Sequence, residues 1–243
     1  MTITEIFLSS KTSVRETIWR PIINLFWLFF WRKEELVEGL ASGQSISALR
    51  HSERGTLIRL IAEEFPFNSL LEAGCGVGQN LSLISSLIPS VKLTGVDLNP
   101  KSLLEAQEAL KDSKCRSISL VESDLSSLSQ FADKSFEIVM ASAVLLYISG
   151  DEIEKVVSEL LRVTSKKLFL LEQHQENPAF LNQHQGVFIP RPGQISGYWL
   201  RDYRKLLEKF VGSQKIEIID VKKPKWVGEK WPQYAKVIVV DVS

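Results

Sequence analysis

Cysteine, histidine and net charge are all scarce in this chain, and each scarcity excludes a class of protein. The 243 residues include two cysteines and three histidines, too few for a disulfide framework or a cysteine-rich zinc site. The 29 Lys and Arg residues balance the 29 Asp and Glu residues, so the formal net charge is zero. A protein that binds nucleic acid usually shows a basic excess or a basic stripe. We therefore expect no nucleic-acid partner.

The first apolar run is short for a membrane-spanning segment. Residues 18–31 form a run of 14 residues with three of the six tryptophans, whereas a spanning helix needs about 20 residues. Pro21 and Asn24 interrupt it, and the basic pair at residues 32–33 resembles an interfacial anchor. Three interpretations stay open: packing on the main domain or a second subunit, which we favour, docking on a membrane surface through residues 18–33, and spanning. No secretory signal is evident, so we expect a cytoplasmic protein, with peripheral membrane contact and a homodimer as alternatives.

Length and composition suit one α/β domain with an extension. Hydrophobic residues make up 44% of the chain, which is enough for a substantial core. We expect an aromatic-rich helical extension or cap over residues 1–50. The main domain then covers residues 51–243, with an insertion on the substrate side at about residues 173–200.

Strand and helix patterns alternate through most of the main domain. The expected strands cover residues 69–72, 91–96, 116–121, 135–141, 167–171, 215–221 and 236–242. The expected helices cover residues 53–65, 80–88, 101–111, 151–163 and 199–210, and the polar residues 173–196 are expected to form a loop. Such alternation implies βαβ units and a parallel sheet, and two final strands without a helix between them suggest an antiparallel pair. We predict a Rossmann-like, doubly wound α/β sheet of seven strands, mostly parallel, with an antiparallel last strand.

A glycine-rich turn follows the first expected strand. It reads Glu72-Ala73-Gly74-Cys75-Gly76-Val77-Gly78, and the next helix presents its N-terminus to the same place. Glycine lets the chain turn tightly and approach a ligand closely. A dinucleotide fingerprint would place its third glycine at position 79, where the chain has Gln79. The spacing therefore argues against a nicotinamide-dependent oxidoreductase.

Acidic residues follow the second and third expected strands. Asp97 lies about 20 residues past the glycines, where a carboxylate can accept hydrogen bonds from both ribose hydroxyls. Asp124, within Ser123-Asp124-Leu125, can accept from an adenine amino group while Leu125 packs on the ring. Simpler interpretations remain: Asp97 as a helix cap ahead of Pro100, and Asp124 as a turn residue.

Together these features resemble the class I S-adenosylmethionine (SAM)-dependent methyltransferases, and most of all small bacterial members of unassigned substrate. The resemblance implies SAM as cofactor and S-adenosylhomocysteine as product, with no metal. In this family the acid before the glycines and the glycine turn hold the methionine part, and the acids after strands two and three hold the nucleoside. The segment after strand four forms the wall near the sulfonium. Carried over, the cofactor-binding residues are Glu72, Gly74, Cys75, Gly76, Asn80, Asp97, Leu98, Ser123, Asp124, Leu125, Ala141 and Ser142.

The acceptor side is defined less well by the sequence. His174 follows the fifth expected strand and is our candidate general base, and His51 or Arg54 could contact the cofactor carboxylate. The spacing of Glu172, His174 and His184 matches no standard metal-ligand pattern. We expect methyl transfer to oxygen or nitrogen of a small or lipid-like acceptor. The alternative is a non-catalytic SAM-binding partner protein that uses its aromatic N-terminus as an interaction surface.

Overall fold

The computed structural model describes residues 53–113, 115, 117–150, 152–176, 186–190, 197–221 and 234–243. The expectations for residues 1–50, including the aromatic run at 18–31 and His51, lie outside the described residues, and so does His184. The division into an extension and a main domain therefore remains a prediction.

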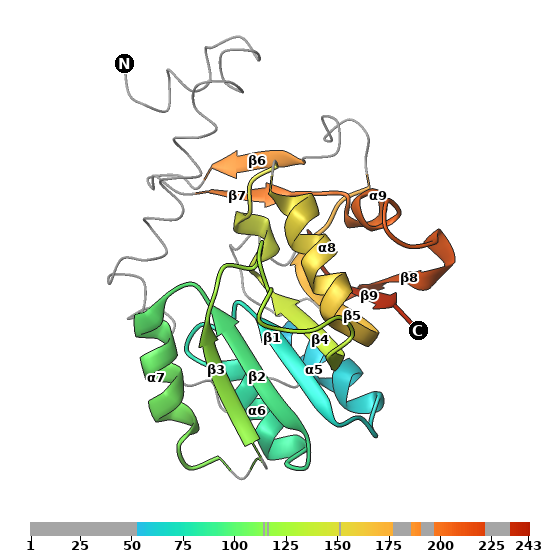
Figure 1. Ribbon diagram of the computed structural model, residues 1–243. Coiled ribbons are helices and arrows are strands. Elements are labelled where there is room, and N and C mark those ends of the chain that lie inside the picture. The colour runs from blue at the N-terminus through green and yellow to red at the C-terminus, as the bar shows by residue number, and fades with distance from the viewer. Residues whose placement is uncertain are drawn as a thin grey trace, which may run out of the picture.

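A seven-stranded sheet forms the centre of the described chain (Figure 1). Its strands, in spatial order, are β3 (Ser117–Glu122), β2 (Lys92–Asp97), β1 (Ser69–Ala73), β4 (Phe136–Ser142), β5 (Thr164–Gln173), β9 (Ala235–Asp241) and β8 (Ile216–Asp220). The strands from β3 to β5 pair in parallel, and β9 runs antiparallel to both of its neighbours. The predicted Rossmann-like sheet with an antiparallel last strand is confirmed.

Helices cover both faces of this sheet. On one face lie α5 (Glu53–Glu63), α6 (Gln79–Leu87) and α7 (Pro100–Leu110); on the other lie α8 (Ile153–Val163) and α9 (Tyr203–Leu207). Alternate residues of β4 feed the two cores: Ile138 and Met140 pack with the first set of helices, and Val139 and Ala141 with the second. A strand buried on both faces has this near-continuous apolar sequence. The described residues also form two short 3-10 helices, η3 (Leu145–Tyr147) and η5 (Ser213–Lys215).

Local chemistry explains where α7 begins, beside the cavity described below. The Asn99 side chain accepts hydrogen bonds from the backbone N–H groups of Lys101 and Ser102, which have no partner within the helix. Pro100 occupies the first turn, where its missing N–H costs nothing. This cap fixes the path of the chain directly after Asp97 at the end of β2.

The segment after β5 differs from its prediction in two places. Residues 187–190, expected to be loop, form β6 (Val187–Pro190), which pairs antiparallel with β7 (Gly197–Leu200). The helix expected over residues 199–210 is also wrong at its start. Residues 199 and 200 belong to β7, and α9 begins at Tyr203 because the Asp202 side chain caps it by accepting from the Lys205 N–H at 3.1 Å.

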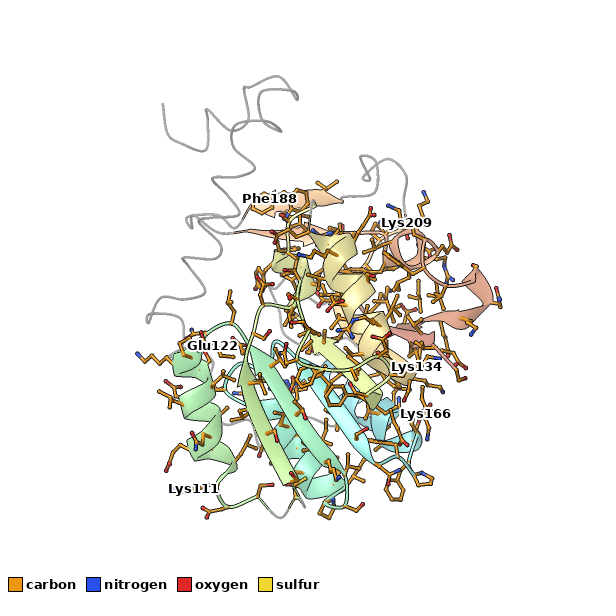
Figure 2. The ribbon with its side chains drawn as sticks, viewed as in Figure 1. Lys111, Glu122, Lys134, Lys166, Phe188 and Lys209 are labelled. Atoms are coloured by element: carbon orange, nitrogen blue, oxygen red, sulfur yellow. The ribbon has the colours of Figure 1, made fainter. Side chains whose placement is uncertain are left out.

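The β6–β7 hairpin lies on the side of the sheet where the parallel strands end (Figure 1). Figure 2 shows Phe188 on this hairpin, and charged side chains such as Lys111 and Lys166 around the outside of the molecule. None of the helices in the described part of the chain has the length and apolarity that a membrane crossing requires.

Candidate functional site

A cavity of about 320 Å³ opens at the carboxyl ends of β1, β2 and β4. The sheet order reverses between β1 and β4, and ligands of doubly wound folds bind at such a switch point. Most of the predicted site residues line this cavity. They are Arg54, Glu72, Gly74, Cys75, Gly76, Asn80, Asp97, Leu98, Asp124, Leu125 and Ser142.

The glycine turn forms the floor of the cavity between β1 and α6. Gly74 has a φ of 71°, and a Cβ there would lie within 3.0 Å of the Val144 side chain, closer than real Cβ contacts. Gly76 has a φ of 51°, and a Cβ there would meet nothing within 4 Å. The backbone N–H groups of Gly74 and Cys75 donate to the carbonyl of Val96, at 2.7 and 2.9 Å. The turn is thus held to β2, and only glycine suits its closest approach.

Two buried acceptor atoms lie at one end of the cavity. Asn80 Nδ2 donates to Glu72 Oε1 at 2.6 Å, which leaves Glu72 Oε2 and Asn80 Oδ1 buried and without a hydrogen-bond partner among the described residues. Burial raises the pKa of Glu72 to about 8, against the opposing effects of the Asn80 hydrogen bond and the positive charge of Arg54. Unpaired buried acceptors are costly, and a ligand with an ammonium group would satisfy both.

Arg54 approaches the same end of the cavity from α5. Its Nη1 donates to Gln79 Oε1 at 2.5 Å. Burial lowers the pKa of the Arg54 guanidinium, while the charge of Glu72 raises it. A guanidinium beside a buried carboxylate offers a place for an anionic group next to a cationic one, as in an amino acid.

Asp97 and Asp124 also line the cavity, directly after β2 and shortly after β3. Asp97 accepts from the N–H of Asn99 through Oδ1 at 2.9 Å and from the N–H of Gly76 through Oδ2 at 2.8 Å, so it connects β2 to the glycine turn. Burial raises the pKa of Asp97, against these backbone hydrogen bonds. Each carboxylate oxygen keeps a second lone pair for a ligand. The cap of α7 is Asn99, so Asp97 does not have the capping role considered as its alternative.

Asp124 combines both of its predicted roles. Its Oδ1 accepts from the N–H of Ser126 at 2.8 Å, which is a turn interaction, and its side chain lines the cavity. The neighbouring Leu125 is buried and lines the cavity as well. Ser123 and Ala141 do not line it: the Ser123 hydroxyl bonds to the carbonyls of Asp124 and Ser127, and Ala141 lies buried in β4.

The segment 143–148, which follows β4 and includes η3, forms a wall of the cavity next to the glycine turn. Ala143 has a left-handed φ of 58°, which is unusual for a residue with a side chain. Val144, Tyr147 and Ile148 line the cavity. The resemblance predicted a wall here but not what fixes it. Glu172 of β5 accepts from three consecutive backbone N–H groups of this segment.

His174 is not among the residues that line the cavity. Its ring is 3% exposed, Nδ1 accepts from the N–H of Tyr203 at 3.1 Å, and Nε2 lies 3.5 Å from Glu176 Oε1. Burial lowers the pKa of His174, partly offset by the charges of Asp202 and Glu176. Its role as a general base stays a prediction, and these contacts favour a part in fixing α9.

Sequence reasoning missed several cavity residues. They are Val77, Gln79, Ile148, Ser149 and Glu152. Val77 lies within the glycine turn and Gln79 directly follows it, so their position in the chain was a usable signal. The other three follow η3 and precede α8, where no local motif marks them. Within the described ranges, no group of three or more His, Cys, Asp or Glu side chains could hold a metal ion.

A cavity at the switch point of a doubly wound sheet, with a glycine turn and acids after successive strands, is typical of folds that bind nucleotides or nucleoside-like ligands. Residues 70–167 match the family model described as a methyltransferase domain. This match includes the glycine turn, Asp97 and Asp124, and it agrees with the resemblance to the class I SAM-dependent methyltransferases. No curated protein matches the sequence significantly.

Solved structures share the fold at low sequence identity. Magnesium protoporphyrin IX methyltransferase (ChlM) from Synechocystis PCC 6803 with bound SAM is 18% identical with a TM-score of 0.54, covering 93% of this chain and 96% of that one. A SAM-dependent methyltransferase from Aquifex aeolicus is 14% identical, with a TM-score of 0.53 and coverage of 83% and 100%. The [4+2]-cyclase SpnF is 18% identical, with a TM-score of 0.56 and coverage of 92% of both chains. One fold thus carries different reactions, and the acceptor must be argued from the site.

Proposed function

We propose that this protein is a SAM-dependent methyltransferase that acts on oxygen or nitrogen of a small or lipid-like acceptor. The observation that carries the proposal is the pair of unpaired buried acceptors, Glu72 Oε2 and Asn80 Oδ1, in the same cavity as Asp97. An amino-acid group and a nucleoside in one ligand need both features. A plain nucleotide, which has phosphates in place of an ammonium group, would leave both acceptors without a donor.

The described residues fit the cofactor part by part. Glu72 and Asn80 would accept from its ammonium group, and Arg54 would pair with its carboxylate. The free lone pairs of Asp97 would accept from the ribose hydroxyls, as such acids do after the second strand of related folds. Asp124 and Leu125 would hold the adenine. His51 lies outside the described residues, and its contact with the cofactor carboxylate stays a prediction.

The bound cofactor would supply a methyl group on a sulfonium, which is already a good leaving group. The chain's own task is to align the acceptor and exclude water, which can contribute roughly 7–11 kcal/mol in favourable cases. An oxygen or nitrogen acceptor must also give up a proton, and a base positioned to take it typically contributes about 100- to 10,000-fold. His174 was predicted for this role, but the Tyr203 N–H already occupies its Nδ1.

The lining of the cavity supports an acceptor with apolar surface. Val144, Tyr147 and Ile148 contribute largely apolar side chains beside the glycine turn. Mostly apolar linings with a few polar groups are typical of small-molecule sites. The aromatic residues Phe188 and Trp199 of the hairpin pack edge-on, with ring centroids 5.5 Å apart, and do not line this cavity.

Titration calorimetry with SAM and S-adenosylhomocysteine tests the cofactor assignment. We expect Asp97→Ala to weaken binding at least tenfold, because hydrogen bonds to a charged group contribute about 1.5–3 kcal/mol. Asp133→Ala is the matched control, since the exposed Asp133 pairs with Arg162 outside the cavity. Absence of binding by the unmodified protein, or unchanged affinity in folded Asp97→Ala, would refute the assignment.

Activity needs its own measurement. Transfer of a labelled methyl group to members of a panel of hydroxyl- and amine-bearing small molecules and lipids would establish the enzyme. Tight SAM binding with no turnover across that panel would instead favour the non-catalytic partner protein.

A further inference from the structure

Glu172 fixes the 143–148 wall from the end of β5. Its Oε1 accepts from the N–H groups of Val144 at 3.0 Å and Leu145 at 2.8 Å, and its Oε2 accepts from Leu146 at 3.1 Å. The side chain is fully buried. A carboxylate that accepts three backbone hydrogen bonds leaves the segment little freedom to rearrange.

Arg201 holds the same wall by donating hydrogen bonds to carbonyl groups of the wall. It is fully buried, its Nη1 donates to the Leu145 carbonyl at 2.7 Å, and its Nη2 donates to the Ile148 carbonyl. Glu172 thus binds the N–H groups of the segment and Arg201 binds its carbonyls, so a buried acidic and a buried basic side chain hold one turn. Burial raises the pKa of Glu172 to about 7, against its three backbone hydrogen bonds and the charge of Arg201. Removal of either leaves the other without its counter-charge in the protein interior.

Arg201 in turn directly follows β7, the second strand of the β6–β7 hairpin. Its backbone is tied to the end of β5 by hydrogen bonds to Gln173 at 3.3 Å and from Gln175 at 2.9 Å. Its guanidinium lies over the Trp199 ring at 5.2 Å, and Trp199 packs edge-on against Phe188. Phe188 lies on the hairpin above the sheet (Figure 2). A chain of contacts therefore runs from the hairpin to the wall.

The wall contacts the glycine turn at its other end. Val144 packs so closely on Gly74 that no Cβ fits between them. The neighbouring Ala143 has a left-handed φ, a conformation that persists only where surrounding contacts impose it. The Ala143 N–H donates to the Leu171 carbonyl at 2.9 Å, next to Glu172.

We propose that Glu172 and Arg201 are positioning residues, which hold the 143–148 wall against the glycine turn and thereby couple the β6–β7 hairpin to cofactor binding. Neither side chain lines the cavity. Both act through the wall. The link to cofactor binding rests on the proposed function. The hydrogen bonds by which Glu172 and Arg201 hold the wall, called the clamp below, do not depend on it.

The test compares Arg201→Lys with Arg162→Lys by calorimetry with SAM. Arg162 also makes several bonds, to Glu159, Asp133 and the carbonyls of Leu128 and Phe131, but it lies outside the cavity. Lysine cannot reproduce two separate guanidinium bonds in either place. We expect Kd to rise at least tenfold in Arg201→Lys and to stay within about twofold in Arg162→Lys, since the second contact set does not reach the wall.

A milder variant and a cofactor-free readout keep the test decisive if Arg201→Lys unfolds. Trp199→Leu removes the ring over Arg201 and leaves the wall's hydrogen bonds in place, and we expect a smaller rise in Kd. Hydrogen exchange at the amides of residues 144–146 reports the clamp without cofactor. We expect faster exchange there in the Arg201 and Trp199 variants and unchanged exchange in Arg162→Lys.

The outcomes separate the two proposals. Unchanged exchange at 144–146 in folded Arg201→Lys would overturn the clamp, and an equal loss of SAM affinity in both arginine variants would overturn the coupling. If the unmodified protein binds no SAM, the proposed function and the coupling fail together, and the exchange data still decide whether the clamp exists.

Discussion

Glu72 combines deep burial with an acceptor atom that has no partner among the described residues. Burial raises its pKa to about 8, so at pH 7 the carboxyl is mostly protonated. The folded state therefore retains a proton that the unfolded chain loses near its ordinary pKa of 4.5. The stability contributed by this proton is present at low pH and is lost as the pH rises from about 4.5 to about 8.

Cofactor binding should change that protonation state. An ammonium group beside Glu72 favours the ionised carboxylate and lowers its pKa. We predict that SAM binding at pH 7 releases close to one proton, measured by calorimetry in buffers of different ionisation enthalpy. Glu72→Gln keeps the side-chain shape and should bind more weakly without this release. Equal proton release by both proteins would assign the proton to another group.

Individual site residues also show which roles can be identified from a sequence. Asp97 and Asp124 were predicted because each follows a strand directly, and the strand ends place them. Glu172 and Arg201 act on a wall that lies 26 to 28 and 53 to 56 residues away in the chain, and no local pattern encodes such contacts. His174 also follows a strand, yet its ring turns into the interior beside Tyr203. Position in the chain indicates the edge of the sheet but not the direction of the side chain.

Two glycines of the turn between β1 and α6 are required for different physical reasons. Gly74 needs both a left-handed backbone and space next to Val144, whereas Gly76 needs only the backbone conformation. We predict that Gly74→Ala lowers the free energy of unfolding by more than Gly76→Ala, for which backbone strain alone costs about 1–2 kcal/mol. Chemical denaturation of the two variants measures this difference. Equal losses would mean that Val144 moves aside without cost.

Most elements were predicted because their patterns are strong. The alternation of apolar strands with helices was enough to predict the parallel sheet. The absence of an expected helix before the last strand was enough to predict the antiparallel pair. The β6–β7 hairpin was missed because residues 173–196 are mostly polar and contain Pro178, Pro190 and Pro192, which suggested a loop. The start of α9 was misplaced although Asp202 is an ordinary N-cap residue, since residues 199–201 before it were assigned to the helix.

At the scale of the whole molecule, the aromatic run at residues 18–31 is the main feature that the described structure leaves untested. A run of 14 residues with three tryptophans is too short to span a bilayer directly, but it has enough apolar surface to stabilise a packed or assembled state. Burial of each large apolar side chain contributes about 1.5–3 kcal/mol. If the run packs on the main domain or a second subunit, as we favour, its loss should affect stability more than membrane affinity.

Deletion of residues 1–40 distinguishes packing of the aromatic run from its docking on a membrane surface. We predict a lower melting temperature, and a lower mass by sedimentation if the run joins two subunits. We expect equal co-sedimentation of the two proteins with anionic vesicles, because packed tryptophans are not free to insert. Substitution of the basic pair Arg32 and Lys33 by Gln in the full chain is the matched control, since it removes only the charge that would attract anionic lipid. Vesicle binding by the full chain that both changes abolish would instead establish residues 18–33 as a membrane-docking surface, and would make a lipid-like acceptor the first to test.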